Sequence, residues 1–236
     1  MKLLLYFDRL SKIVERKKKR INMAETVSKE REKQILKAAR GIFARFGFSK
    51  TTMEDISAEV AMGKASLYYY FPTKESLFEA VTSQERDEFM QKIGFTLQKQ
   101  NSAAEKLKTY VEERMKFFHE LLNLGMLSYH SFAKTKPVHQ KLSNEFALKE
   151  MKVIESIIEE GKTSGEFDQE INAEELSSTL IHLLQGLRLR AIKGASGMQS
   201  EEKSIYDELS REMILTINIF ISAIKAREKE SLGSGK

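Results

Sequence analysis

The sequence predicts an all-α fold, and three observations support this class. Prolines interrupt the chain only at Pro72 and Pro137. Long stretches consist of strong helix formers such as Ala, Leu, Glu, Lys, Gln and Met. No segment shows the strict alternation of apolar and polar residues that is typical of a half-buried strand. The 236 residues are enough for one or two domains, and we expect a three-helix N-terminal domain followed by a longer helical bundle.

The net charge of +5 is concentrated at the N-terminus. Residues 1–22 contain eight basic and two acidic side chains, which leaves 31 basic and 32 acidic residues from Met23 onward. The overall basicity therefore says little about the partners of the main part of the chain. Locally, Lys29–Lys50 has seven basic residues against Glu30 and Glu32, and such a basic face is typical of a nucleic-acid-binding surface.

Several classes of protein are excluded by composition. The sequence has no cysteine, which excludes disulfides, thiol catalysis and thiolate metal sites. The apolar stretch Leu3–Phe7 is too short for a secretory signal, and its basic cluster follows it instead of preceding it. The apolar run Met213–Ile224 is shorter than the roughly 20 residues that a membrane helix needs. We expect a soluble, cytoplasmic protein with no membrane segment.

Residues 1–24 form a separate basic arm in our interpretation, and two explanations of it remain open. In the first, Met23 is the true start, and the preceding residues are a gene-prediction artefact or a frayed, disordered tail. In the second, the basic cluster Lys17–Arg20 contacts the phosphates of a nucleic acid and adds salt-dependent affinity.

The N-terminal domain is expected to comprise residues 25–81. Its first helix is expected from Ser28 to Phe46. Ser28 is the expected N-cap, and Gly47 is the expected stop. Apolar residues recur between them at helical spacing, which predicts a buried stripe. The stripe consists of Ile35, Ala38, Ala39, Ile42 and Phe46.

Two short helices follow. Thr52 is the expected N-cap of the second helix, and Gly63 breaks the chain after it. The third helix, Lys64–Phe71, ends at Pro72, and Thr73 caps a fourth. The contacts expected to hold the third helix join Leu67, Tyr70 and Phe71 to Ile42, Phe46 and Ile56.

Two short helices joined by a tight turn are typical of a helix-turn-helix, whose second helix enters the major groove of DNA. In this sequence the groove-facing helix is Lys64–Phe71. Small side chains at Ala65 and Ser66 permit close approach, and Lys64 can reach a phosphate or a guanine edge. Residues 68–70 are three consecutive tyrosines, which point about 100° apart on a helix. At least one of them must therefore face outward. The alternative interpretation is that all three tyrosines are core aromatics.

The stretches Thr52–Ile56 and Lys64–Phe78 together resemble the DNA-binding signature of the tetracycline-repressor (TetR) family. The resemblance covers about Lys29–Val81. It implies a transcription repressor that binds an inverted-repeat DNA operator as a homodimer, is released by a small-molecule inducer and needs no cofactor. The DNA contacts that it implies are phosphate contacts at Thr52 and Lys74, base-edge contacts at Lys64, Ala65 and Ser66, and backbone or base contacts at Tyr68 and Tyr69.

The turn departs from the family pattern of glycine, an aliphatic residue and serine. This sequence has Ala61, Met62 and Gly63 there. Ala61 is therefore expected to adopt a conformation that glycine prefers. Gly63 replaces a serine cap at the start of the DNA-facing helix, which costs only a few tenths of a kcal/mol.

The second domain, residues 82–230, is expected to bind ligand and to dimerise, with a flexible tail at 231–236. The sequence predicts loops at Ser164–Gly165 and Gly194–Gly197. The expected helices are Thr73–Gln100, Ser102–Leu124, Met126–Lys134, Pro137–Thr163, Asn172–Ala195 and Ser200–Lys229.

The last two helices predict a dimer interface. Nearly every side of Met213–Ile224 is apolar, which indicates burial by its own subunit and by another, and Gly186 allows close helix approach. The alternative is that both helices fill the core of one subunit. The apolar stripe of the preceding helix consists of Leu176, Leu180, Leu183, Leu184, Leu187 and Ala191.

The resemblance also implies a pocket for an unidentified ligand, for which plain bundle core is the alternative reading of the same residues. The four histidines lack the spacing of metal ligands. The sequence also shows none of the patterns that indicate an enzyme, namely a nucleophile with its base, a phosphate-binding loop or paired carboxylates. The candidate pocket residues are Phe117, Phe118, Leu121 and Phe146, with His130, His182 and Gln185 as polar contacts.

Overall fold

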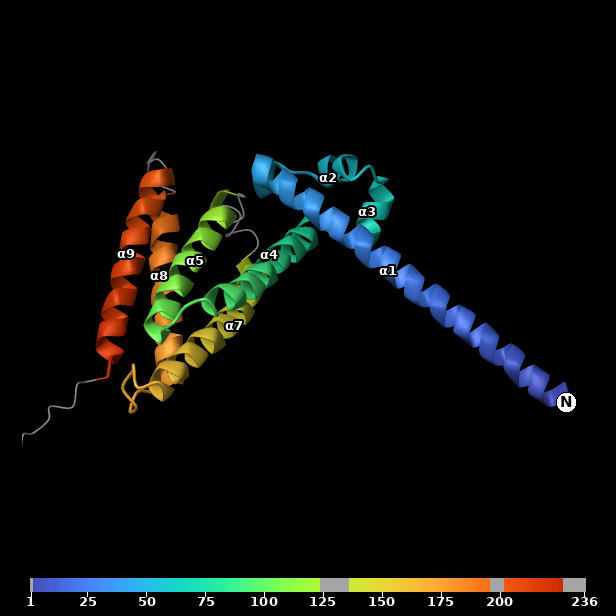
Figure 1. Cartoon of the computed structure of the whole chain (residues 1–236). Coiled ribbons are helices and arrows are strands. Elements are labelled where there is room, and N and C mark those ends of the chain that lie inside the picture. Colours follow the sequence, from blue (N-terminus) through green and yellow to red (C-terminus); the bar gives the residue numbers. More distant parts are fainter. Residues whose placement is uncertain (1, 124–135, 196–201, 227–236) are drawn as a thin grey trace, which may run out of the picture. The chain divides into compact units, whose positions relative to one another are not determined.

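The computed structural model describes residues 2–123, 136–195 and 202–226 (Figure 1). These residues form eight helices, and the isolated bridge that they contain joins Phe167 to Lys225. The predicted all-α class is confirmed. The chain divides into two compact units, Met1–Val81 and Thr82–Lys236.

Helix α1 (Lys2–Lys50) is much longer than expected. The predicted N-cap at Ser28 is wrong, because the helix runs through this position, and residues 2–24 are its first part. Residues 2–40 contain no glycine or proline, so no backbone signal ends the helix there. Gly47 does interrupt the helical geometry, with a φ of 72°.

The short helices α2 (Met53–Glu59) and α3 (Lys64–Tyr70) form as predicted. Thr52 caps α2 in a capping box, since its hydroxyl accepts the Asp55 N–H at 3.2 Å while its own N–H donates to the Asp55 carboxylate at 2.8 Å. Ala61, in the turn, has a φ of 49°, which confirms the expected glycine-like conformation.

The core of the first unit is built around three aromatic rings from α1 and from the start of the next long helix. Phe43, Phe48 and Phe78 are buried, with ring centroids 4.8 to 6.0 Å apart. The prediction that Phe46 belongs to this core is wrong, because its side chain is 53% exposed. The kink at Gly47 turns the chain so that Phe48 fills the core instead. The core predictions at Ile35, Ala39, Ile42, Ile56, Leu67 and Phe71 are confirmed, whereas Ala38 and Tyr70 are only half-buried.

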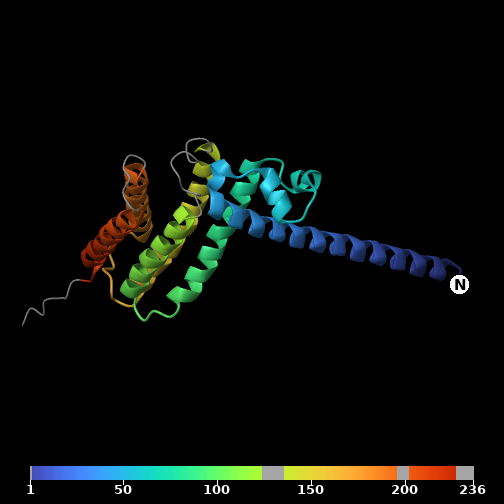
Figure 2. The same cartoon turned by 90° about the horizontal axis from the view of Figure 1, so that it is seen from above.

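The long helices lie close to their predicted bounds. The predicted helix Met126–Lys134 lies outside the described residues. Within the second unit, α5 (Ala103–Asn123) packs against α7 (Lys136–Thr163) and α9 (Glu202–Ile224), and α8 (Ala173–Ala195) packs against the same two helices (Figure 2). Helix α4 spans Lys74–Leu97.

Side chains cap several of these helices. Thr73 accepts the Ser76 N–H at 3.0 Å at the start of α4, and Asn172 accepts the Glu175 N–H at 3.1 Å at the start of α8. The start of α5 receives a carboxylate from a distant loop, since Glu166 accepts the N–H groups of Ala103 and Ala104 at 2.7 and 3.1 Å. Each cap satisfies N–H groups that the helix itself leaves without partners.

The loop after α7 is anchored by a buried ring. Phe167 is fully buried against Gly161, where a Cβ would lie 2.1 Å from a ring carbon. Glycine is therefore required for this close approach. The loop also joins the end of α9, because the Asp168 N–H donates to the Ile224 carbonyl at 2.9 Å.

Candidate functional site

Helix α3 buries one side and exposes the other. Leu67 is fully buried, whereas Tyr69 is 82% exposed and Tyr68 is 38% exposed. The prediction that the three tyrosines cannot all be core residues is confirmed. Lys64, Ala65 and Ser66 in the first turn are exposed as well. The three residues predicted to contact base edges therefore share an accessible surface at the start of α3.

An ion pair joins α2 to the first residue of α3. The Lys64 ammonium contacts the Glu54 carboxylate, and both side chains are more than half exposed. This hydrogen bond raises the pKa of Lys64 and lowers the pKa of Glu54. An exposed pair of this kind is weak, so the ammonium can exchange the carboxylate for a phosphate.

The Lys74 side chain is bonded inside the first unit. Its ammonium donates to the carbonyl oxygens of Phe48 at 2.8 Å and Thr51 at 2.9 Å, and lies 4.3 Å from the centre of the Phe48 ring. Two of its three N–H donors therefore hold the end of α1 and the approach to α2 against the start of α4. The phosphate contact stays a prediction, with one N–H left to make it.

Thr52 is exposed at the start of α2, and its hydroxyl takes part in the capping box. The hydroxyl donates to the Asp55 carboxylate at 2.7 Å, and this bond lowers the pKa of Asp55. The predicted phosphate contact of Thr52 also stays a prediction.

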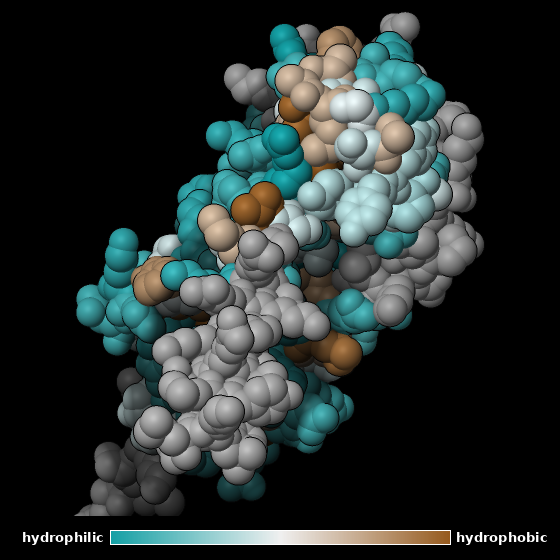
Figure 3. Space-filling model, turned by 90° about the vertical axis from the view of Figure 1, so that its right-hand side faces the viewer, coloured by the Kyte–Doolittle hydropathy of each residue, from teal (hydrophilic) through white to brown (hydrophobic). Residues whose placement is uncertain are grey.

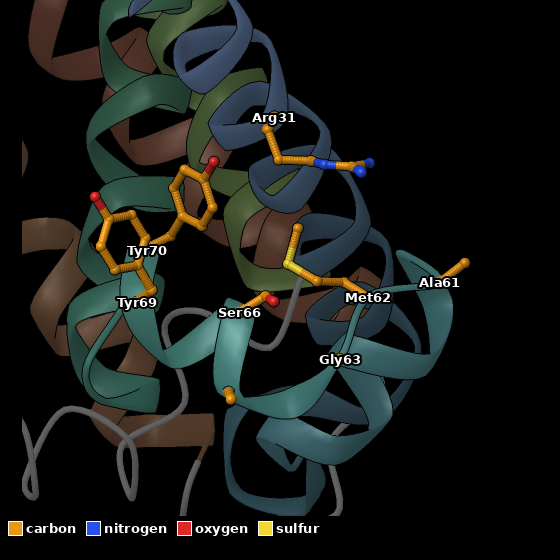
Figure 4. Close-up of a pocket in the computed structure, with 8 residues that line it drawn as sticks. Arg31, Ala61, Met62, Gly63, Ser66, Tyr69 and Tyr70 are labelled. Atoms are coloured by element: carbon orange, nitrogen blue, oxygen red, sulfur yellow. The ribbon is translucent and has the colours of Figure 1, made fainter. Parts of the chain in front are cut away.

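The turn and α3 border an open hollow of about 620 Å³ (Figure 4). Figure 4 shows Tyr69 and Tyr70 on one side of it and Ala61 and Met62 on the other. Arg31 of α1 lies at its rim, although the sequence placed this residue only within a general basic face. Among the coloured residues of Figure 3, apolar surface is limited to small patches in a largely hydrophilic face.

The predicted ligand-pocket residues separate into three groups. Phe117, Phe118 and Phe146 are brought together in a buried aromatic cluster, with ring centroids 5.3 to 6.4 Å apart. His182 is exposed and Gln185 is half-buried. The side chains of Leu121 and His130 lie outside the part of the chain that the structure describes.

A cluster of buried charges that the sequence did not predict lies beside these aromatic rings. Arg114 is fully buried and donates to Glu150 from Nε at 2.5 Å and from Nη2 at 3.2 Å. The Tyr110 hydroxyl donates to the same carboxylate at 2.7 Å. Two more arginines, Arg86 and Arg188, are also buried. Single arginines within apolar helical stripes were the feature of the sequence that could have indicated this cluster, since a charge is rarely buried without a partner.

The arginines lie over aromatic rings. The guanidinium carbons of Arg188 and Arg114 are 4.2 and 4.5 Å from the centre of the Phe118 ring. Burial lowers the pKa of Arg86 to about 10, and burial together with the charge of Arg114 lowers the pKa of Arg188 to about 9. Both therefore stay positively charged at neutral pH.

The described residues were also compared with the requirements of a metal site and of a membrane-spanning helix. Among them, no three His, Asp or Glu side chains are placed to hold a metal ion together. No helix in the same residues is both long and apolar enough to cross a membrane.

Two family models match adjacent parts of the chain. Residues 35–81 match the model of bacterial regulatory proteins of the tetR family, and residues 83–184 match the C-terminal region of YsiA-like proteins. A transcriptional regulator from Cytophaga hutchinsonii, known from its crystal structure, is 39% identical with a TM-score of 0.72. The match covers 81% of this chain and 96% of that one.

Curated relatives match over shorter stretches. The HTH-type transcriptional regulator YfiR of Bacillus subtilis is 32% identical over 39% of this chain and 46% of its own length, so the match spans less than half of that protein. The HTH-type transcriptional regulator QacR of Staphylococcus aureus is 27% identical over 57% of this chain and 72% of its own length. Since the matched models, the similar solved structure and the helix-turn-helix geometry agree, the chain belongs to the TetR family of helix-turn-helix transcriptional regulators.

Proposed function

We propose that this regulator is a repressor that binds an inverted-repeat operator as a homodimer and leaves it when a small molecule binds the second unit. The observation that supports operator binding best is the first turn of α3. There Lys64, Ala65 and Ser66 are exposed on a helix whose opposite side is fixed in the core by Leu67. A rigid helix with an accessible first turn is the element that enters the major groove in this class of protein.

The side chains at this surface suit different parts of DNA. We expect Ser66 and Lys64, which are exposed, to contact base edges, and the exposed Tyr69 to donate to a phosphate. Arg31, at the rim of the hollow beside α3, adds a cation from α1. Loss of a base contact should alter sequence preference, whereas loss of a phosphate contact should weaken all sequences alike.

The test is a titration of the full-length protein against DNA from the region flanking its gene and against scrambled DNA. Ser66→Ala and Lys64→Ala should weaken specific binding by about 5- to 100-fold and change nonspecific binding much less. Lys108→Ala is the matched control, since it removes an exposed charge on α5, in the second unit. Wild-type affinity in both α3 variants would contradict the assignment of α3 as the recognition helix.

Dimerisation is supported by apolar side chains on both sides of α9. Met213 and Ile217 are buried within their own unit, whereas Leu215 and Ile219 are about 60% exposed. Leu183 of α8 is 49% exposed. Exposed apolar side chains on two adjacent packed helices favour an interface with a second copy, in the four-helix arrangement that the family resemblance implies.

The dimer is tested with Leu215→Lys combined with Ile219→Lys. This variant should have the monomer mass in light scattering, while the wild type should have twice that mass. Leu148→Lys is the control, because Leu148 is equally exposed but lies on α7. Leu184 and Ile217 are unsuitable positions, since their burial within one subunit means that charges there would unfold it. A monomeric wild type at micromolar concentration would refute the dimer.

Release by a ligand requires that the ligand bind the DNA-competent and DNA-incompetent states with different affinity. Helix α4 is continuous from Lys74 in the first unit to Leu97 in the second. It is therefore the element through which we expect the two units to be coupled. A ligand that binds the second unit tightly and leaves the operator dissociation constant unchanged would contradict this coupling.

A further inference from the structure

We propose that Arg86, Arg114 and Arg188 bind the anionic group of a small amphipathic ligand, such as a carboxylate or phosphate ester with an apolar body. This inference deepens the proposed function, because it names the chemical class of ligand that the second unit recognises. It depends on a charge imbalance, on buried donors without partners and on the aromatic rings beside them.

The charge imbalance is large for a protein interior. Arg114 has no exposed surface, and Arg86 and Arg188 are each 7% exposed. Arginine stays protonated in proteins, so the cluster holds three positive charges. Glu150 is also fully buried and pairs with Arg114, and the remaining carboxylate that acts on Arg86 is Glu145 at the surface.

Glu150 accepts three hydrogen bonds from Tyr110 and Arg114. One of its oxygens accepts both the Tyr110 hydroxyl and Nε of Arg114, and the other accepts Nη2 of Arg114. The charge of Glu150 favours the protonated form of Arg188 without a hydrogen bond between them, and the nearby positive charge of Arg114 disfavours that form. Glu150 therefore fixes the position of Arg114 and does not neutralise the other two arginines.

The guanidinium groups also have buried N–H donors that no atom of the described residues accepts. These donors are Nε and Nη1 of Arg86, Nη1 of Arg114 and Nε of Arg188. Buried donors are nearly always hydrogen-bonded, and the exceptions call for a bound water, a bound ion or a functional role. An oxyanion with two or three oxygens would accept several of them and supply the missing negative charge.

The surroundings indicate that the anion has an apolar body. Arg114 and Arg188 both lie over the Phe118 ring, and Arg86 lies 5.4 Å from the centre of the Phe146 ring. Phe117 stacks on Phe89 at 4.6 Å and extends the aromatic surface. Ligand sites of this type combine apolar walls with a few placed polar groups, and the arginines are those groups here.

The test uses the full-length protein without DNA and four probes with the same ten-carbon chain. Decanoate and decyl phosphate have anionic groups, whereas decanol is neutral and decyltrimethylammonium is cationic. Calorimetry and thermal unfolding should show binding of one or both anionic probes, at least about tenfold tighter than binding of the other two. The tighter of the two anions shows whether a carboxylate or a phosphate is preferred. Equal binding of decanol would overturn the proposal.

Variants separate recognition from a structural role. Arg188→Met and Arg86→Met should each weaken binding of the anionic probe by at least about tenfold. Arg190→Met is the matched control on the same helix, since Arg190 is exposed and pairs with Glu208 and Glu212. It should bind the probe within about twofold of the wild type. Wild-type binding in both Arg188→Met and Arg86→Met would overturn the site.

The melting temperature without ligand gives a second readout. Arg188→Met removes a buried charge that has no carboxylate partner among the described residues, so it should unfold at the wild-type temperature or above. Arg114→Met should unfold at a lower temperature, because it leaves Glu150 buried without its cation. A large drop in melting temperature for Arg188→Met would show that this arginine is structural, and would overturn its assignment to ligand.

Failure of this site and failure of the proposed function give different results. If no anion binds while the operator is still bound, the anion site is refuted and DNA recognition is retained. If the anion binds and the operator dissociation constant does not change, the site is supported and ligand-driven release is refuted.

Discussion

Replacing Lys74 by methionine should destabilise the first unit. Methionine keeps a long apolar side chain against the Phe48 ring but removes the ammonium that donates to the carbonyls of Phe48 and Thr51. A hydrogen bond to a charged group generally contributes about 1.5 to 3 kcal/mol. Water can reach the freed carbonyls, because Lys74 is half-buried. We therefore expect a total loss of roughly 2 kcal/mol in the free energy of unfolding.

The measurement is urea unfolding followed by circular dichroism. The midpoint should fall for Lys74→Met, while the control Lys50→Met should stay within about 0.5 kcal/mol of the wild type. Lys50 is exposed and has the same charge in the same unit.

DNA titration at several salt concentrations decides between the two roles of Lys74. Unchanged unfolding, together with uniformly weaker DNA binding and a salt slope smaller by about one, would refute the structural role. That result would make Lys74 a simple phosphate ligand.

Three further predictions concern backbone geometry, packing and pH. Ala61→Gly should raise stability by up to about 1 kcal/mol, because alanine has a φ of 49° there; an unchanged or lower melting temperature would argue against strain. Gly161→Ala should cost about 1 to 3 kcal/mol, since its Cβ would overlap the buried Phe167 ring; wild-type stability in urea would show that the ring can move. The pKa of Asp55 is lowered in the folded state by its bonds with Thr52, so the stability from this group is present above the ordinary pKa of 3.8 and is lost as the pH falls through the lowered value. Asp55→Asn should remove that part of the acid sensitivity. Urea midpoints measured between about pH 6 and pH 3 test this, and a variant whose stability depends on pH as the wild type does would contradict it.

Helix starts could be predicted from sequence where a cap acts on backbone a few residues away. Thr52 and Thr73 cap helices as predicted, because each bond needs only the following turn. Ser28 failed as a cap, since strong helix formers precede it and the helix continues through it. A capping side chain permits a helix start but does not impose one.

Contacts between distant segments were harder to predict. Phe46 and Phe48 are both apolar and close in sequence, and only the kink at Gly47 decides which one is buried. The arginine cluster combines residues from three helices, and Arg114 is 36 positions from the carboxylate that it binds. No local periodicity reports such a pairing, so the residues predicted for a ligand pocket included the buried aromatic rings but none of the arginines beside them.

The contact between Lys64 and Glu54 has a consequence for how tightly this regulator holds unrelated DNA. Part of nonspecific affinity comes from the release of cations when a protein ammonium replaces them at the phosphates. Lys64 already has the Glu54 carboxylate as its counterion. When the ammonium moves to a phosphate, it exposes this negative charge, which repels the duplex and attracts cations again. The net cation release from this contact should therefore be less than that of an unpaired lysine. The recognition helix would then gain little from an arbitrary sequence, and a larger share of its binding free energy would come from correct base contacts.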